Sequence, residues 1–319
     1  MDNSRVHPNS KEMPMSRFAV IDFGSNTIRL CVYQVEDAVE GSITKKHLST
    51  LLNYKVMAGI SSYVKDGKIS DKGIKKAART IKEQHERARY FDCKRIEVFA
   101  TAVLRNCQNS AEAQMTIERD CELPITILSN EEEAHLGLVG AKLDGPIADA
   151  IMVDIGGGST ELTVLTAGNE GACTSLPQGS LSSFSMHTKG ILPTKKEIEQ
   201  IESEFKKLFD MLPKKVYRSK DLVGIGGAIR SAAKVYGDIF RGGKRSNTLT
   251  LDQVNDLLAS YHEDPAGFMR SALQTIPDRI HTFIPGCVLI RLIFERTGAQ
   301  RMRIAKHGVR EGFLIERML

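Results

Sequence analysis

Two glycine-rich loops have the composition of phosphate-binding sites. The first reads Asp22-Phe-Gly-Ser-Asn26 and the second reads Asp154-Ile-Gly-Gly-Gly-Ser159, and each follows an apolar, β-prone run. Glycines after a strand let backbone N–H groups approach a phosphate without a Cβ in the way, and serine and asparagine side chains add further donors. A carboxylate at the strand end is suited to Mg²⁺, which prefers few carboxylates together with phosphate oxygens. The two loops therefore predict a site where phosphate and Mg²⁺ meet.

The alternative for each loop is an ordinary glycine turn in a hairpin. A single loop would favour that alternative, but two in the same arrangement favour phosphate binding. We assign phosphate contact to Ser25, Asn26, Gly156, Gly157, Gly158 and Ser159, and metal binding to Asp22 and Asp154.

A third glycine loop, Gly224-Ile-Gly-Gly227, precedes an expected helix. Binding of phosphate or a base through Gly226 and Gly227 and a plain strand-to-helix turn are equally compatible with this loop. The chain has no G-x-x-x-x-G-K-[ST] sequence, which excludes a P-loop nucleotide hydrolase.

The elements that must position these loops alternate between strand and helix. Each Asp-x-Gly loop joins two β-prone runs, so the pattern of strand, tight turn and strand occurs twice and suggests duplicated lobes. Amphipathic helices are expected after Ser70 and after the capping box that begins at Thr194, and a strand is expected over 95–100. The stretch 237–247 is glycine-rich and basic and is expected to be an exposed loop. The sequence therefore predicts an α/β protein with two lobes.

Composition and charge restrict the classes of function. The chain has 319 residues, which is longer than most domains that fold around a single hydrophobic core. Charged residues make up 26% of the sequence, as in an ordinary globular protein. Its net charge of +5 is compatible with an anionic substrate but too small to indicate nucleic acid. No apolar run reaches the ~18 residues of a membrane span, and residues 1–15 lack the apolar core of a secretory signal. We expect a cytoplasmic protein that binds neither nucleic acid nor membrane.

Six strings along the chain together resemble one known family. Their joint occurrence, in the family's order and from about residue 17 to the C-terminus, makes the chain similar to the exopolyphosphatase and guanosine pentaphosphate phosphohydrolase family. The strings are Ala19-Val-Ile-Asp-Phe-Gly-Ser-Asn26, Ala100-Thr-Ala-Val-Leu-Arg105, Ser129-Asn-Glu-Glu-Glu-Ala134, Val153-Asp-Ile-Gly-Gly-Gly-Ser-Thr-Glu161, Gly224-Ile-Gly-Gly-Ala-Ile-Arg230 and Gly308-Val-Arg-Glu-Gly312.

The resemblance implies a fold, a reaction and a cofactor. The fold is the actin-like fold of the sugar-kinase and heat-shock ATPase superfamily, with two lobes built on duplicated ribonuclease-H-like domains. We place a loose tail at 1–15, the first lobe at 16–130 and the second at 131–319, with 308–319 as a candidate to pack back on the first lobe. The implied reaction is Mg²⁺-dependent attack of water on the terminal phosphate of polyphosphate or guanosine pentaphosphate, with guanosine tetraphosphate as a further candidate ligand. A homodimer is among the oligomeric states left open.

The resemblance also implies roles for single residues. Asn26 and Arg105 match family positions that contact phosphate, as does the second glycine loop. Asp154 and Glu161 match carboxylates linked to the metal and the water. We therefore assign Arg105 to both substrate binding and catalysis, and Glu161 to both the metal and catalysis.

Three consecutive glutamates, 131–133, represent the motif that holds the family's general base. Alignment on the alanine that follows points to Glu133. Ser129 and Glu132 have the spacing of a capping box, which gives Glu132 a structural role at a helix start. Acidic residues in a first helical turn also complement the helix dipole, which is the alternative explanation for the cluster. Like charges nearby would raise the proton affinity of Glu133, as suits a base that works near neutrality.

Two departures from the family pattern keep other functions open. The chain has Ser182 where the family commonly carries an arginine, and it ends soon after 308–312, where longer members continue into a helical C-terminal domain. A short-form enzyme acting on short polyphosphate or on nucleotide phosphates fits both departures. The alternatives are a sensor that binds guanosine tetra- or pentaphosphate without hydrolysis, and an ATPase or kinase of the same superfamily.

Overall fold

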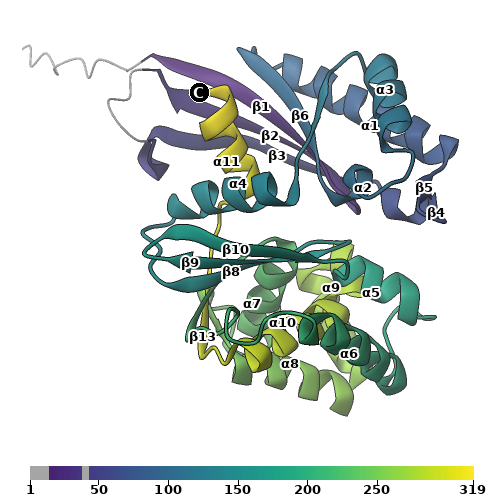
Figure 1. Ribbon diagram of the computed structural model, residues 1–319, viewed down its shortest axis with the longest axis vertical. Coiled ribbons are helices and arrows are strands. Elements are labelled where there is room, and N and C mark those ends of the chain that lie inside the picture. Colours follow the sequence, from purple (N-terminus) through teal and green to yellow (C-terminus); the bar gives the residue numbers. More distant parts are fainter. Residues whose placement is uncertain (1–13, 38–42) are drawn as a thin grey trace, which may run out of the picture.

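Two lobes, each with a central sheet, make up the molecule (Figure 1). The computed structural model describes residues 14–37 and 43–319, so the predicted tail 1–15 lies outside the described residues except for its last two. Met15 is already the first residue of β1.

The first lobe is a five-stranded sheet with the order β3-β2-β1-β6-β7. β2 is antiparallel to β1 and to β3, while β6 and β7 run parallel to β1. Helices α1 and α3 pack their apolar side chains against one face of this sheet. The bounds are β1 Met15–Phe23, β2 Thr27–Glu36, η1 Lys45–His47, β3 Leu48–Met57, η2 Ile60–Tyr63, β4 Val64–Lys65, β5 Lys68–Ile69, α1 Asp71–Arg89, β6 Arg95–Ala100, α2 Ala102–Arg105, α3 Ser110–Cys121 and β7 Ile125–Ile127.

The second lobe repeats this arrangement. Its sheet has the order β10-β9-β8-β11-β13, with β12 added at the edge, and again the first three strands are antiparallel and the next two parallel. This repeated topology confirms the predicted actin-like α/β fold with two related lobes. The bounds are β8 Ala150–Ile155, β9 Thr160–Thr166, β10 Asn169–Leu176, α5 Ser180–His187, α6 Lys195–Asp210, β11 Asp221–Ile225, α7 Gly227–Phe240, β12 Thr248–Thr250, α8 Leu251–Glu263, α9 Pro265–Thr275, η3 Pro277–Arg279, α10 Ile280–Thr297 and β13 Arg301–Ile304.

The helix α4 (Asn130–Lys142) lies between the two sheets (Figure 1). Its Leu136 packs in the core on the second face of the first sheet, whereas its Leu138 packs against the second sheet. The chain ends on the first lobe, where α11 (Val309–Phe313) is followed by the π-helical turn η4 (Leu314–Met318). Phe313 contacts Phe99 of β6 with ring centroids 5.0 Å apart. One helix therefore serves both cores, and residues 308–319 cover the first sheet.

Glycines allow α4 and α11 to approach each other at backbone distance. A Cβ on Gly140 would overlap the carbonyl of Gly308, and a Cβ on Gly312 would overlap the carbonyl oxygen of Leu136. Because backbone atoms cannot move aside as a flexible side chain can, this junction depends on residues without a Cβ.

Most predicted elements are confirmed, with one correction. The Ser70 hydroxyl accepts from the Gly73 N–H and caps α1, the capping box at Thr194 begins α6, and the strand over 95–100 is β6. The predicted loop 237–247 is wrong at its start, because Gly237 to Phe240 form the last turn of α7. A Cβ on Gly237 would lie 2.7 Å from the Lys244 carbonyl oxygen, so this glycine marks a close backbone approach rather than the end of the helix.

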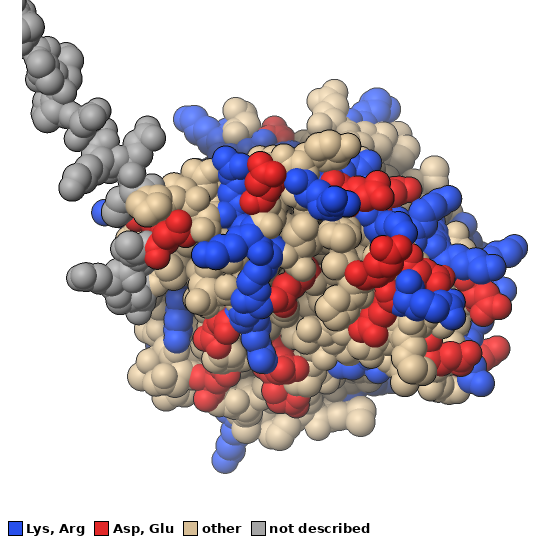
Figure 2. Space-filling view, turned by 90° about the horizontal axis from the view of Figure 1, so that it is seen from above, with Lys and Arg blue, Asp and Glu red and all other residues tan. Residues whose placement is uncertain are grey.

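The surface seen from above in Figure 2 carries lysines and arginines interspersed with aspartates and glutamates. Such mixing gives no large field of one sign on that face. Within 14–37 and 43–319, no helix is both long and apolar enough to cross a bilayer.

Candidate active site

The two Asp-x-Gly loops are the turns of two equivalent hairpins, β1–β2 and β8–β9. In the first turn the Gly24 N–H donates to the Thr27 carbonyl at 3.0 Å, and in the second the Gly156 N–H donates to the Ser159 carbonyl at 2.9 Å. The same three-residue spacing closes both turns. The two lobes therefore present the same local structure at the same place in their sheets.

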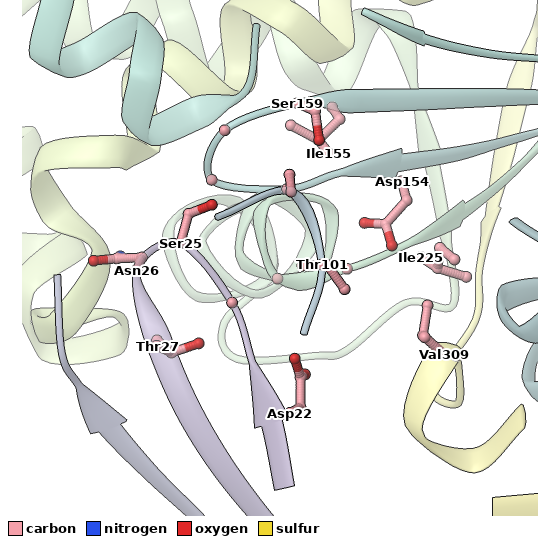
Figure 3. Close-up of a pocket in the computed structure, with 18 of the residues that line it drawn as sticks. Asp22, Ser25, Asn26, Thr27, Thr101, Asp154, Ile155, Ser159, Ile225 and Val309 are labelled. Atoms are coloured by element: carbon pink, nitrogen blue, oxygen red, sulfur yellow. The ribbon is translucent and has the colours of Figure 1, made fainter. Parts of the chain in front are cut away.

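The strand register sets a different partner opposite each aspartate. Asp22 pairs with Arg29 across β1 and β2, whereas Asp154 pairs with Glu161 across β8 and β9. Figure 3 shows the side chains of Asp22 and Asp154 pointing toward each other across the space between the lobes. This space is a cleft of about 160 Å³.

The cleft brings together all but one of the residues that the sequence assigns to the site. The exception is Arg105, which lies behind the lining and is described below. The assigned residues that line the cleft are Asp22, Ser25, Asn26, Glu133, Asp154, Gly156, Gly157, Gly158, Ser159, Glu161, Gly226 and Gly227.

Close approaches explain why glycine stands at two of these positions. Gly226 has a φ of 89°, and a Cβ there would overlap the Asp154 carboxylate. A Cβ on Gly158 would lie 3.2 Å from the Ser25 hydroxyl oxygen, so the second loop meets the first across the cleft. Larger side chains at these positions would fill the space where a phosphate group could approach backbone N–H groups.

Three buried carboxyl groups converge on the second lobe's side of the cleft. Burial, reinforced by the negative charge of Glu161, raises the pKa of Asp154 to about 7. Burial also raises the pKa of Glu161, even though the Ser175 hydroxyl donates to its Oε1 at 2.8 Å. Such shifts are typical of functional sites, because charged groups are held there away from water.

Glu133 differs from the two glutamates before it. The Ser129 N–H donates to Glu132 Oε2 at 3.0 Å and the Glu132 N–H donates to Ser129 Oγ at 3.1 Å, so the predicted capping box is confirmed. Glu131 is exposed. The side chain of Glu133 is only 13% exposed, and burial together with the nearby Glu161 charge raises its pKa to about 8. Of the three, only Glu133 lines the cleft, and its raised pKa lets it take up a proton near neutral pH.

Arg105 holds Glu133 from behind. Its Nη1 donates to Glu133 Oε2 and to the Leu128 carbonyl, both at 2.8 Å. Its Nε and Nη2 are buried, and among the described residues neither has a hydrogen-bond partner. Buried N–H groups of a guanidinium are costly to leave unpaired, so this position of Arg105 lowers the stability of the folded protein.

The cleft is also lined by four arginines that the sequence analysis does not assign to the site. Arg310 lies in a string of the family resemblance, and its Nη1 donates to Asp22 Oδ2 at 2.9 Å. Arg230 also lies in such a string, and burial lowers its pKa to about 10. Arg29 could have been found from the hairpin register, because it stands opposite Asp22. Arg279 comes from η3, and no sequence signal marks it.

The carboxylates fit Mg²⁺ in the way this ion is usually held. Within the described part of the chain, no group of three or more His, Cys, Asp or Glu side chains is arranged to enclose a metal. Mg²⁺ needs no such enclosure, because it keeps several waters and binds one or two carboxylates together with substrate phosphates. Asp154 and Glu161 are neighbouring buried carboxylates that repel each other. Their chemistry therefore suits a divalent cation shared with phosphate oxygens.

Known proteins share both the sequence pattern and the fold. A Haemophilus influenzae protein, named as a candidate exopolyphosphatase, is 24% identical over 318 residues, which cover 98% of this chain and 95% of that protein. The Aquifex aeolicus member of the Ppx/GppA family has a similar structure, with a TM-score of 0.74 and 22% identity over 95% of this chain and 97% of that one. An exopolyphosphatase from Cytophaga hutchinsonii superposes with a TM-score of 0.79 at 19% identity, over 94% of this chain and 96% of that one.

A family model adds evidence that depends on sequence alone. The model of the Ppx/GppA phosphatase family matches residues 38–319. The match contains the second glycine loop, the third glycine loop, the glutamate cluster and the C-terminal string described above. The chain therefore belongs to the Ppx/GppA phosphatase family.

Proposed function

We propose that this protein is a hydrolase that releases the terminal phosphate of inorganic polyphosphate, of guanosine pentaphosphate, or of both, with Glu133 as the general base. The observation that supports this proposal most is the position of Glu133, a buried carboxyl group with a pKa of about 8 that faces two phosphate-type loops across a small cleft. Membership of a phosphatase family supports the reaction class.

The proposed reaction moves one proton and one phosphoryl group. The oxygen of a water molecule forms a bond to the terminal phosphorus while the bond from that phosphorus to the bridging oxygen breaks. The leaving chain keeps the electron pair, and Glu133 takes the proton of the water. Backbone N–H groups of the two loops stabilise the charge that develops on the transferred group, and Arg105 holds Glu133 through the hydrogen bond from its Nη1.

Asp154 and Glu161, with Asp22 on the opposite lobe, are the residues that we propose hold Mg²⁺. When bound there, Mg²⁺ neutralises charge on phosphate oxygens. Asp22 also pairs with Arg310, so its carboxylate is already partly neutralised and is less available than the other two.

Phosphate release measured with Mg²⁺ tests the proposal. Tripolyphosphate, long-chain polyphosphate and guanosine pentaphosphate should be compared side by side. In Glu133→Gln, kcat for each active substrate should fall by about 10²- to 10⁴-fold, the usual contribution of a general base. Glu131→Gln is the matched control, because the same change is made two residues away on an exposed side chain. Equal rates for Glu133→Gln and the wild type would refute the assignment.

The same assay separates the sensor alternative from the enzyme. Ser182, where the family commonly has arginine, accepts a hydrogen bond from the Gly179 N–H at 2.8 Å and caps α5. In this chain the side chain at position 182 therefore caps α5 and supplies no positive charge. Tight binding of guanosine tetra- or pentaphosphate without phosphate release from any substrate would support the sensor, and transfer of phosphate to an acceptor other than water would support a kinase.

A further inference from the structure

A second hollow lies beside the cleft and shares Arg230 with it. Its volume is about 740 Å³, compared with about 160 Å³ for the cleft. Pockets that bury small ligands usually measure about 300 to 1,000 Å³, so the cleft alone is small for a substrate with several phosphate groups. The two spaces together have room for a longer ligand.

Five basic side chains from three segments line this space, which we call the basic hollow: Arg230, Lys234, Arg241, Arg245 and Lys306. No Asp or Glu is among the described residues that line it. Of the five charged groups, only that of Arg245 lies within ion-pair distance of a described carboxylate, with Nη2 3.4 Å from Asp238. Most of the positive charge is therefore uncompensated within the described part of the chain.

The positions of these cations destabilise the protein when no ligand is bound, which indicates an anionic ligand. Arg230 and Lys234 are four residues apart on α7, so two like charges lie one above the other on the same helix face. Burial lowers the pKa of Arg230 to about 10, which shows that its charge is held against desolvation. Repulsion of this kind is relieved when anionic groups bind between the cations.

The basic hollow is also held in shape by hydrogen bonds to its backbone and side chains. Nη1 of Arg230 donates to the Ala305 carbonyl at 3.2 Å, which fixes the guanidinium at the boundary between the two spaces. The Lys306 N–H donates to Asp144 Oδ2 at 2.6 Å, and Lys234 Nζ donates to the Thr275 carbonyl at 2.8 Å. These contacts leave the remaining donors of the lysine and arginine side chains for a ligand.

We propose that the basic hollow is a second phosphate-binding subsite, which holds the phosphate groups of the substrate that are remote from the bond being cleaved. This inference rests on the proposed function and deepens it, because it names the part of the protein that would distinguish long or highly phosphorylated substrates from short ones. Arg230 joins the two spaces, so a chain of phosphates whose end lies in the cleft extends past this residue into the basic hollow.

The double variant Arg241→Gln/Lys306→Gln tests the subsite, because both side chains are exposed and their loss should not disturb the core. For long-chain polyphosphate, KM should rise by roughly 3- to 20-fold, the loss expected for two exposed charge pairs. For tripolyphosphate, KM should change by less than about two-fold, because two exposed pairs outside the cleft contribute little to a ligand that short. For long-chain polyphosphate, the slope of log KM against the logarithm of the salt concentration should become shallower. The expected change is about 0.7 for each phosphate contact that is lost, the value found for single-stranded nucleic acids.

The matched control is Lys214→Gln/Lys215→Gln, which removes the same charge from exposed positions outside the basic hollow. An equal rise of KM in the control, an unchanged KM for the long chain, or an equal rise for both substrate lengths would overturn the proposal. Guanosine pentaphosphate is run in parallel. If the KM for guanosine pentaphosphate rises in the Arg241/Lys306 variant and not in the control, the subsite also binds nucleotide phosphates. If only the KM for long-chain polyphosphate rises, the subsite is specific to polyphosphate.

Failure of the proposed function can be told apart from failure of this inference. If the wild type released phosphate from no substrate, the hydrolase would be refuted, and binding of long-chain polyphosphate would still be measured by calorimetry. Weaker binding by the Arg241/Lys306 variant than by the Lys214/Lys215 control would support the subsite, and equal binding would overturn it.

Discussion

Replacing Glu133 with glutamine should lower kcat strongly and yet stabilise the folded protein at neutral and alkaline pH. The folded state raises the pKa of Glu133 to about 8, chiefly through burial. A carboxyl group with a raised pKa binds its proton more tightly in the folded than in the unfolded chain, so its contribution to stability is present at low pH and is lost as pH rises. Glutamine is neutral at every pH and avoids this loss.

The size of the effect follows from the shift. One pKa unit corresponds to about 1.4 kcal/mol, so a group whose pKa moves from 4.5 to about 8 can lower the free energy of unfolding by roughly 3 kcal/mol at pH 7. Glu133 and Glu161 interact and share their titration, so we expect about 1 to 3 kcal/mol at pH 7. At pH 5, close to the ordinary pKa of a glutamate, the gain should fall below about 1 kcal/mol.

Urea unfolding in a chelating buffer, at pH 5, 7 and 8.5, measures this difference for the wild type, Glu133→Gln and the exposed control Glu131→Gln. Glu133→Ala is a useful contrast, because it removes the side-chain oxygen that accepts a hydrogen bond from Arg105 Nη1, which glutamine can keep, and should reduce stability. The reasoning would be refuted if Glu133→Gln were no more stable than the wild type at pH 8.5, or if its gain did not grow with pH.

Three further predictions concern the junction and the pH response. Gly312→Ala should lower the free energy of unfolding by about 1 to 3 kcal/mol, since its Cβ would overlap the Leu136 carbonyl oxygen; an unchanged urea midpoint would contradict the close packing of α4 and α11. Arg310→Met should lower the free energy of unfolding by about 1 to 3 kcal/mol, because Asp22 loses its hydrogen-bonded partner and keeps only the charge of Arg29 opposite it, and adding Asp22→Asn should recover part of the loss in a double-mutant cycle. For the free enzyme, kcat/KM should rise with pH through an apparent pKa near 8, because Glu133 must lose its proton to act as a base; a flat profile from about pH 6 to about pH 9 would argue against this role.

The sequence was sufficient for the features that have a local pattern. The two hairpin turns can be predicted from glycines that follow β-prone runs. The repeated Asp-x-Gly sequence indicates that the two turns are equivalent. The capping box of Ser129 and Glu132 follows from a spacing of three residues, and it leaves Glu133 free to face the cleft. Such features depend on neighbours in the chain, so the sequence alone contains the information.

Features that depend on distant contacts could not be predicted in the same way. Arg105 is assigned to phosphate contact by the resemblance, but in the structure its hydrogen bond to Glu133 places it behind the lining of the cleft. Arg279 reaches the cleft from η3, next to Gly227, and only the packing of the second lobe brings the two together. The loop after α7 begins later than the sequence predicts for a similar reason. Gly237 allows close contact with the backbone of Lys244, a distant contact, and does not end the helix.

The two hairpins also explain how related lobes come to do different work. Equivalent positions of the register hold Arg29 opposite Asp22 in the first lobe and Glu161 opposite Asp154 in the second. The first hairpin therefore carries compensating charges and the second carries two carboxylates. The charge of Glu161 adds to the burial that raises the pKa of Asp154, and it also adds to the raised pKa of Glu133. The residue opposite each aspartate therefore distinguishes the two hairpins: a cation stands beside Asp22, and a second carboxylate beside Asp154 strengthens proton binding.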